Sequence, residues 1–167
     1  ARMLHRLLGE NVDLQFQCAP QLPSVHADMA MLEQVIVNVA LNARDAMPKG
    51  GRLSIRTRLA AIDAAGVQRN PEARLGEFVC LSLQDTGCGM DAETLSRIFE
   101  PFFTTKEVGR GTGLGLPMVY GIVKQHQGWV EVESQVGRGS TFHVFLPSCS
   151  RRPAALPPAP QAMVKQT

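Results

Sequence analysis

The sequence predicts a single domain of the mixed α/β class, in which helices pack against one sheet. Two long segments, residues 28–47 and 114–127, have apolar residues at helical spacing. Shorter segments such as 12–17 and 53–57 alternate apolar and polar residues with the period of a half-buried strand. A chain of 167 residues can bury about two-thirds of its unfolded surface, which is sufficient for one hydrophobic core.

The first part of the chain predicts a short helix, a strand and a long helix. Residues 2–9 are typical of the end of a helix, and residues 12–17 of a strand that ends before Pro20. Asp28 can cap the long helix, because its carboxylate can accept hydrogen bonds from the free amides of the first turn. This helix continues to Met47, after which a proline and two glycines turn the chain.

The middle of the chain predicts two further strands and a short helix. Residues 53–57 alternate as a strand, and residues 77–83 form another that leads directly into Asp85. Between them, residues 60–76 are small, polar and interrupted by glycine and proline, so they are interpreted as a surface loop. Asp91 is expected to cap a short helix.

The last part of the chain predicts a helix followed by a hairpin. The helix at 114–127 is expected to stop at Gly128, where glycine can adopt the left-handed conformation. Two strands, 129–134 and 140–146, are then joined by a glycine-containing turn. After Pro147 the sequence becomes rich in proline, which is typical of an extended linker.

Two asparagines interrupt the apolar pattern of the long helix. Asn38 and Asn42 are four residues apart and therefore project from the same side, at the edge of the apolar face. Asparagine is unfavourable inside a helix because its amide competes for backbone hydrogen bonds. We therefore expect the pair to contact a polar group outside the helix.

Glycine clusters mark the stretch from Asp85 to Gly115 as a candidate ligand site. Asp85-Thr-Gly-Cys-Gly-Met90 precedes an aromatic, hydroxyl-rich segment at 99–106, and Gly-Arg-Gly-Thr-Gly-Leu-Gly follows at 109–115. The second cluster ends at a helix start, where free amides and the helix dipole favour phosphate. It is neither a P-loop nor a dinucleotide fingerprint, and by itself a flexible loop would also explain it.

Composition excludes several other classes of function. A net charge of +2 gives no basic surface of the kind that nucleic-acid binding requires. No apolar run approaches the roughly 20 residues of a membrane span. The four cysteines lack the paired spacing of a zinc or redox motif, so a reducing, cytoplasmic setting is expected. The sequence begins within a helical pattern, so we expect an excised domain.

Taken together and in order, these segments resemble the N, G1, F, G2 and G3 boxes of the histidine-kinase catalytic domain. The family to which that domain belongs also includes the gyrase, Hsp90 and MutL ATPases. The resemblance covers about residues 11–147. The segments NARDAMPKGG and GLPMVYGIVKQHQG are most similar to the nitrogen-regulation (NtrB) and cell-cycle (CckA) branch of sensor kinases, some of which are hybrid kinases.

The resemblance implies a Bergerat-type two-layer α/β sandwich, in which a mixed, mostly antiparallel sheet packs on helices. ATP would lie between helices under a lid at roughly residues 99–113. Residues 1–10 would be the end of a preceding dimerisation helix or linker, and residues 11–147 the ATP-binding catalytic domain. Residues 148–167 would form a disordered, Pro-rich linker.

The resemblance also implies how each end of ATP is recognised. Asp85 would accept a hydrogen bond from the exocyclic amine of adenine, which distinguishes adenine from guanine. Thr141 would complete this contact through its hydroxyl. Asn42 would ligate Mg²⁺ with support from Asn38, since an amide oxygen is a suitable hard ligand.

A larger set of positions is implied for nucleotide binding and catalysis. The implied ATP-binding residues are Asn38, Asn42, Asp45, Asp85, Gly87, Gly89, Met90, Thr104, Thr105, Lys106, Gly111, Thr112, Gly113, Leu114, Gly115, Leu116 and Thr141. The implied catalytic residues are Asn38, Lys106 and Arg110. The two lid cations would neutralise the charge of the terminal phosphate. The alternative is that they are ordinary solvated lysine and arginine side chains without a role in the site.

Two positions depart from the patterns of related proteins. Asn38 lies where the gyrase and Hsp90 branch has a glutamate that activates water, and an amide cannot act as a general base. Slow hydrolysis and transfer to another nucleophile are therefore expected. Asp45 lies where many histidine kinases have a lysine or arginine that contacts phosphate, so Arg44 or the lid would have to supply that contact.

The implied function is transfer of the ATP γ-phosphoryl group to a histidine on a separate dimerisation domain. The partners would be those dimerisation and phosphotransfer helices and a response-regulator receiver domain, with no nucleic acid and no membrane contact. The domain would be cytoplasmic even if the parent protein were membrane-anchored. The alternatives are an ATPase of the same fold and a nucleotide-sensing module without phosphotransfer.

Overall fold

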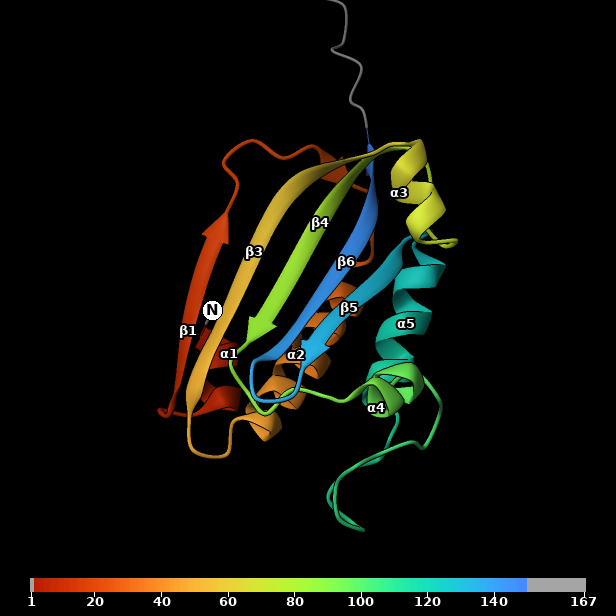
Figure 1. Cartoon of the computed structure of the whole chain (residues 1–167). Helices are drawn as coiled ribbons and strands as arrows, with labels where there is room; N and C mark the ends of the chain where they lie inside the picture. Colours follow the sequence, from red (N-terminus) through yellow and green to blue (C-terminus); the bar gives the residue numbers. More distant parts are fainter. Residues whose placement is uncertain (1, 150–167) are drawn as a thin grey trace, which may run out of the picture.

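The computed structural model describes residues 2–149 and shows a sheet on one side and helices on the other (Figure 1). The predicted two-layer α/β sandwich is confirmed. The sheet has six strands in the order β1-β3-β4-β6-β2, with β5 also paired to β6. Only the β1–β3 pair is parallel among the described strands. The strands are β1 (Val12–Cys18), β2 (Ser24–Val25), β3 (Gly51–Ile62), β4 (Gly76–Asp85), β5 (Trp129–Gln135) and β6 (Gly139–Cys149).

Three helices cover one face of the sheet, and two short helices lie in the connections. They are α1 (Arg2–Leu8), α2 (Met29–Ala46), α3 (Ala64–Arg69), α4 (Ala92–Arg97) and α5 (Gly115–Gln125). The predicted caps are present, because Asp28 accepts a hydrogen bond from Met31 N at 3.1 Å and Asp91 from Thr94 N at 2.7 Å.

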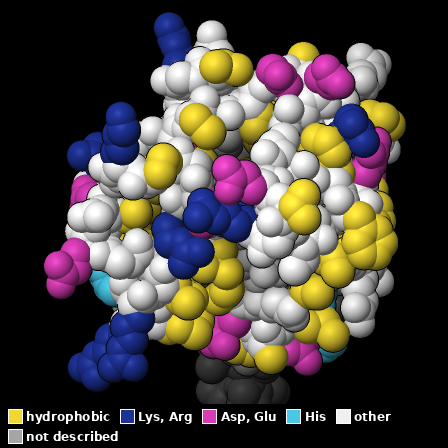
Figure 2. All heavy atoms as spheres, turned by 90° about the horizontal axis from the view of Figure 1, so that it is seen from below, with side chains coloured by type: hydrophobic (Ala, Val, Ile, Leu, Met, Phe, Trp, Pro, Cys, Tyr) yellow, Lys and Arg dark blue, Asp and Glu magenta, His cyan; other side chains and the backbone are white. Residues whose placement is uncertain are grey.

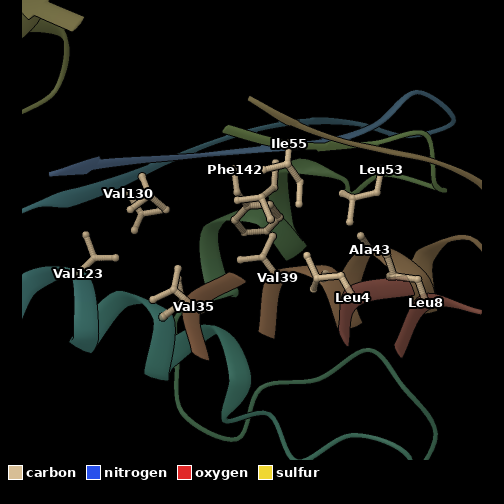
Figure 3. Close-up of a cluster of buried hydrophobic side chains, with 14 of the residues drawn as sticks. Leu4, Leu8, Val35, Val39, Ala43, Leu53, Ile55, Val123, Val130 and Phe142 are labelled. Atoms are coloured by element: carbon tan, nitrogen blue, oxygen red, sulfur yellow. The ribbon is translucent and has the colours of Figure 1, made fainter. Parts of the chain in front are cut away.

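The main core lies between the sheet and helices α1, α2 and α5. Figure 3 shows side chains from α1, α2 and α5 directed toward side chains from β3, β5 and β6. Val35 and Val39 from α2, Leu53 from β3, and Val123 from α5 are at most 1% exposed. The apolar stripe of α2 therefore faces the sheet, and this packing fixes which side of the helix remains for a ligand.

A second apolar cluster on the opposite face of the sheet corrects the prediction of a surface loop at 60–76. Trp129 is fully buried there, with Phe145 stacked on it at 4.6 Å between ring centroids. β3 continues to Ile62, α3 follows, and Ala73 from the next turn is buried in this cluster. The segment contributes Ala60, Ala73 and the partly buried Ile62 to this cluster, so most of its contact with the sheet is made by small side chains.

The sheet also extends beyond the predicted strands at one edge. β2 was not predicted from the sequence, and it pairs with Ser148 and Cys149 at the end of β6. β6 therefore continues two residues past the predicted start of the linker. The remainder of the predicted linker, residues 150–167, lies outside the described residues.

The end of α5 differs from the prediction in which residue turns the chain. Gln127, with φ of 60°, adopts the left-handed conformation, whereas Gly128 does not. A Cβ at Gly128 would lie 2.0 Å from the carbonyl oxygen of Phe145. The glycine is therefore required by close approach to β6 and not by backbone conformation.

No helix between residues 2 and 149 is long and apolar enough to span a bilayer.

Two glycine substitutions in and after α5 are expected to change stability in opposite directions. Gly128→Ala should lower the free energy of unfolding by about 1–3 kcal/mol, because its methyl group would overlap β6. Gly121→Ala should raise it by about 0.5–1 kcal/mol, since a Cβ there meets no atom within 4 Å and alanine favours the helix. Urea unfolding followed by Trp129 fluorescence measures both changes. A Gly128→Ala variant as stable as the parent would contradict the packing argument.

Candidate functional site

A cavity of about 450 Å³ lies between α2, the lid segment and the ends of β4 and β6. It brings together most of the site residues that the sequence predicted, from segments far apart in the chain. Those that line it are Asn38, Asn42, Asp45, Asp85, Gly89, Met90, Thr104, Thr105, Lys106, Arg110, Gly111, Thr112, Gly113, Gly115 and Leu116. Gly87, Leu114 and Thr141 do not line it.

Asp85 is the buried acidic group of the cavity. It ends β4, is 5% exposed, and its Oδ1 accepts hydrogen bonds from Gly87 N at 2.8 Å and Ser140 N at 3.3 Å. Burial raises the pKa of the carboxyl, although both backbone hydrogen bonds oppose this shift. No group within residues 2–149 donates to Oδ2, so this oxygen remains available to a donor on a ligand.

Gly87 and Gly89, which follow Asp85, hold its carboxylate in place because the backbone packs closely at both glycines. A Cβ at Gly87 would lie 2.7 Å from Ala46 at the end of α2, so Gly87 contacts the helix and not the cavity. Gly89 has φ of 68°, and a Cβ there would lie 2.0 Å from the carbonyl oxygen of Gln135. The loop after β4 is thus clamped between α2 and the β5–β6 hairpin.

The structure places Ser140, and not Thr141, beside Asp85. Side chains alternate along β6, so Ser140 and Phe142 face the cavity while Thr141 faces the other side of the sheet. The Ser140 hydroxyl lies 2.8 Å from that of Ser134 in the hairpin. Ser140, and not Thr141, is therefore the hydroxyl residue of β6 that faces the cavity beside Asp85.

The polar stripe of α2 forms one wall of the cavity. The Asn42 side-chain nitrogen donates to Asn38 O at 2.9 Å, which leaves the Asn42 amide oxygen without a partner among the described residues. The Asn38 side-chain nitrogen is buried and also has no partner within residues 2–149. A Cβ built on Gly115, at the start of α5, would lie 3.8–4.0 Å from both side-chain amides. Free amide oxygens suit a hard cation such as Mg²⁺, and an orphaned buried amide fits a site completed by a ligand.

The lid segment after α4 brings a cation to the end of α2. The Lys106 ammonium is bonded to Asp45 Oδ2, while Arg44 donates twice to Asp45 Oδ1, at 3.1 and 3.2 Å. Partial burial opposes ionisation of Asp45, but the hydrogen bonds from Lys106 and Arg44 outweigh it and lower the pKa. Arg110, by contrast, is 79% exposed and lies 3.9 Å from Glu107.

The base of the lid is fixed by contacts among aromatic residues and the glycine cluster. Phe99 packs against the main core, and its ring centroid lies 5.2 Å from that of Tyr120, so it anchors the start of the lid. Phe102 N donates to Gly113 O at 2.9 Å, so the two ends of the lid are held together. Leu114 is the N-cap position of α5 and is 39% exposed.

Several residues that line the cavity were not predicted from the sequence. They are Leu41, Ala43, Ala46, Cys88, Thr94, Ile98, Phe103, Pro117, Ser140 and Phe142, whereas Arg44, the predicted alternative phosphate contact, also lines the cavity. Most are apolar or small, and the same types fill the core, so residue type alone does not mark them. Their apolar surface beside the free carboxylate oxygen suits a planar base that carries an amine.

Comparison with known proteins agrees with this geometry. Residues 27–149 match the family described as histidine kinase-, DNA gyrase B-, and HSP90-like ATPase. The chain is 51% identical over 148 residues to the sensor kinase CckA of Brucella abortus (strain 2308), which covers 87% of this chain and 15% of that protein. It is 40% identical over 139 residues to the sensor histidine kinase ZraS of Escherichia coli (strain K12), covering 83% of this chain and 26% of that protein. The chain thus spans about a quarter or less of the length of these relatives.

Solved structures show the same fold. The mycobacterial sensor histidine kinase MprB superposes with a TM-score of 0.67 at 26% identity, over 88% of each chain. Full-length ShkA in complex with AMPPNP superposes with a TM-score of 0.66 at 27% identity, over 88% of this chain and 29% of that one. With the fold, the cavity and the family match in agreement, the chain belongs to the histidine kinase-, DNA gyrase B- and HSP90-like ATPase family, as an ATP-binding catalytic domain of the sensor histidine kinase type.

Proposed function

We propose that this domain holds Mg²⁺-ATP and passes the γ-phosphoryl group to a histidine on a separate dimerisation domain. The observation that carries the proposal is the state of the acidic groups in the cavity. Asp45 and Asp85 are its only carboxylates among the described residues. Asp85 is hydrogen-bonded to backbone amides, and Asp45 is paired with Lys106 and Arg44.

Neither carboxylate would serve as a general base on water. The free Oδ2 of Asp85 would accept from the base of the nucleotide, and Asp45 is paired with Lys106 and Arg44. Asn38 occupies the α2 position where the related ATPases carry a glutamate, and its amide cannot accept a proton. A site that binds ATP without activating water keeps the phosphoryl group for another nucleophile. This argument favours a kinase over an ATPase of the same fold.

The base would be recognised by the free oxygen of Asp85. Its Oδ2 would accept from the adenine amine, while Ser140 N and Gly87 N hold Oδ1. A hydrogen bond to a charged group contributes about 1.5–3 kcal/mol. Guanine presents an oxygen at the same position and would face the carboxylate unpaired, which accounts for selection of ATP.

The phosphates would lie between the α2 amides and the start of α5. Asn42 and Asn38 would hold Mg²⁺ through amide oxygens, and the metal would supply positive charge to the phosphates. Gly115 brings the start of α5 close to both amides, since a Cβ built there would lie 3.8–4.0 Å from them. Free backbone amides at the start of α5 favour bound phosphate, and Lys106 is a lid cation that lines the cavity.

An exposed apolar surface beside the lid would contact the dimerisation helices. Phe102 is 74% exposed, Leu114 39% and Met118 42%, and the three are neighbours through hydrogen bonds from Phe102 N to Gly113 O and from Met118 N to Leu114 O. Such clusters of exposed apolar groups mark interaction sites. Figure 2 shows hydrophobic side chains at the surface of the end of the molecule that carries the lid.

The organisation of the parent protein follows from this function as part of the proposal. α1 would be the end of the dimerisation helix, and the catalytic domain would extend from residue 11 to the end of β6 at Cys149, two residues beyond the predicted boundary. A response-regulator receiver domain would take the phosphoryl group onward. Because the function requires ATP, the domain would be located in the cytoplasm.

Asp85→Asn should lower ATP affinity by roughly 10- to 100-fold, which corresponds to loss of one charged hydrogen bond. The new amide nitrogen would face the adenine amine, whereas the amide oxygen could still accept from Gly87 N and Ser140 N. The GTP-to-ATP affinity ratio should rise. Isothermal titration calorimetry measures both, with Asp91→Asn, an exposed carboxylate in the following turn, as the matched control. Unchanged ATP binding would remove Asp85 from base recognition.

Thr141→Val should leave ATP affinity within about twofold of the parent, because this side chain faces away from the cavity. Ser140→Val should weaken binding by about tenfold or more, since the added methyl groups would crowd the Asp85 carboxylate and break the contact with Ser134. Equilibrium binding of a fluorescent ATP analogue distinguishes the two variants. If only Thr141→Val loses affinity, the hydroxyl that contacts the base belongs to Thr141 and not to Ser140.

The function itself is tested by mixing the domain with Mg²⁺, γ-labelled ATP and the separately expressed dimerisation helices of the parent protein. Label should appear on those helices in a form that is stable to base and labile to acid, as expected of phosphohistidine. The Asp85→Asn domain serves as the control and should transfer far less at low ATP. Rapid release of phosphate to water would indicate an ATPase, and binding without transfer would indicate a nucleotide sensor.

A further inference from the structure

The ion pair between Asp45 and Lys106 forms a wall shared by two cavities. One is the nucleotide cavity, and the other, of about 650 Å³, lies between the end of α1, the turn after α2 and the lid. Both are lined by Arg44, Asp45, Thr105, Lys106 and Arg110. Figure 2 shows basic and acidic side chains meeting at the centre of this end of the molecule.

Asp45 is held rigidly on the α2 side of this wall. Arg44 donates two hydrogen bonds to Oδ1 and a third, at 3.0 Å, to Leu7 O in α1. Oδ2 is therefore directed toward the lid, where it meets Lys106. The two side chains of the pair are 31% and 33% exposed, so the pair is neither buried nor fully solvated.

Lys106 is the only lid cation that the structure pairs with α2 among residues 2–149. Arg110 is 79% exposed and faces Glu107 within the lid itself. Lys106 N also bonds to Thr104 Oγ1 at 3.1 Å, so the backbone at the lysine is turned toward the cavity wall. A movement of the Lys106 side chain therefore bears directly on whether the lid is attached to α2.

We propose that Asp45 is a specificity-determining residue that holds Lys106 until a terminal phosphate replaces it, so that only a nucleoside triphosphate releases the lid from α2. The proposal rests on the function proposed above. A carboxylate and a phosphate compete for the same ammonium, and the pair must break before Lys106 can neutralise a γ-phosphate. A diphosphate lacks that group and leaves the pair intact.

The expected effect is modest, because the pair is partly exposed. Ion pairs of this kind contribute about 0.2–1 kcal/mol, which corresponds to at most roughly fivefold in affinity. Removing Asp45 frees Lys106 in advance, so it should strengthen ATP binding about two- to fivefold. ADP binding should change by less than twofold.

Affinities of AMPPNP and ADP for the parent, Asp45→Asn, Lys106→Met and the double variant, measured by calorimetry with Mg²⁺, form a double-mutant cycle. We expect Asp45→Asn to raise the AMPPNP-to-ADP affinity ratio, and this gain to vanish in the Lys106→Met background. Glu93→Gln is the matched control, since it removes an exposed carboxylate of α4 that lines neither cavity. It should leave the ratio unchanged.

A second readout follows the lid directly. Hydrogen exchange of the lid amides, residues 104–113, should be faster in ligand-free Asp45→Asn than in the ligand-free parent. In the parent, ADP should leave the exchange rates of the lid amides at their ligand-free values, whereas AMPPNP should change them. Both measurements are independent of phosphotransfer.

Three results would overturn the proposal. Asp45→Asn could raise both affinities equally, which would show a general charge effect, or could lower AMPPNP affinity, which would make Asp45 a binding group. Unchanged lid exchange in Asp45→Asn would show that the pair does not hold the lid. If the parent binds neither nucleotide, the proposed function fails, whereas selective failure in Asp45→Asn removes only the role of this pair.

Discussion

The site depends on the hydrogen bonds that tie Asp85 to the start of β6. Asp85 ends one strand, and Ser140 begins the antiparallel neighbour, so the β4–β6 register decides which groups meet at the carboxylate. A shift of one residue would turn every β6 side chain to the opposite face. Met90 N and the Ser140 hydroxyl both bond to Ser134, which extends the same network into the β5–β6 hairpin. Base recognition is thus a property of the sheet edge and not of one residue.

Helix α2 supplies the other half of the site by dividing its surface between two tasks. Val35 and Val39 are buried against the sheet, and the amides three residues further along each face the cavity. Residues three apart lie on neighbouring stripes of a helix, so packing of the apolar stripe fixes the direction of the polar one. Asn38 lowers the stability of the fold, because a buried amide nitrogen without a partner costs about 1–3 kcal/mol. Such a loss of stability is typical of a functional site.

The sequence could predict those features that depend on neighbouring residues. Helix caps, the asparagine pair and the glycine clusters have local patterns. The structure contains both predicted caps and brings the asparagines and glycines of both clusters to one cavity. The choice between Ser140 and Thr141 could not be predicted, because both are hydroxyl residues and the register of β6 is set by its partners. The Asp45–Lys106 pair joins residues 61 positions apart, for which no periodic pattern exists. The segment at 60–76 was misread because its packing uses alanines over Trp129, which carry no visible apolar signal.

The charges around the cavity explain how one fold can serve transfer instead of hydrolysis. The same α2 stripe that would carry a general base in an ATPase has an amide at Asn38 and a carboxylate at Asp45 that is already neutralised by two cations. Activation of water requires a free base beside the phosphates. Asp85 keeps one free oxygen, but the proposed function uses it for the adenine amine, and Asp45 is paired. Phosphoryl transfer instead requires position and positive charge, which the amides, the start of α5 and the lid lysine can supply. Under the proposed function, this domain would therefore hold ATP in readiness for transfer, and the nucleophile would come from the dimerisation domain.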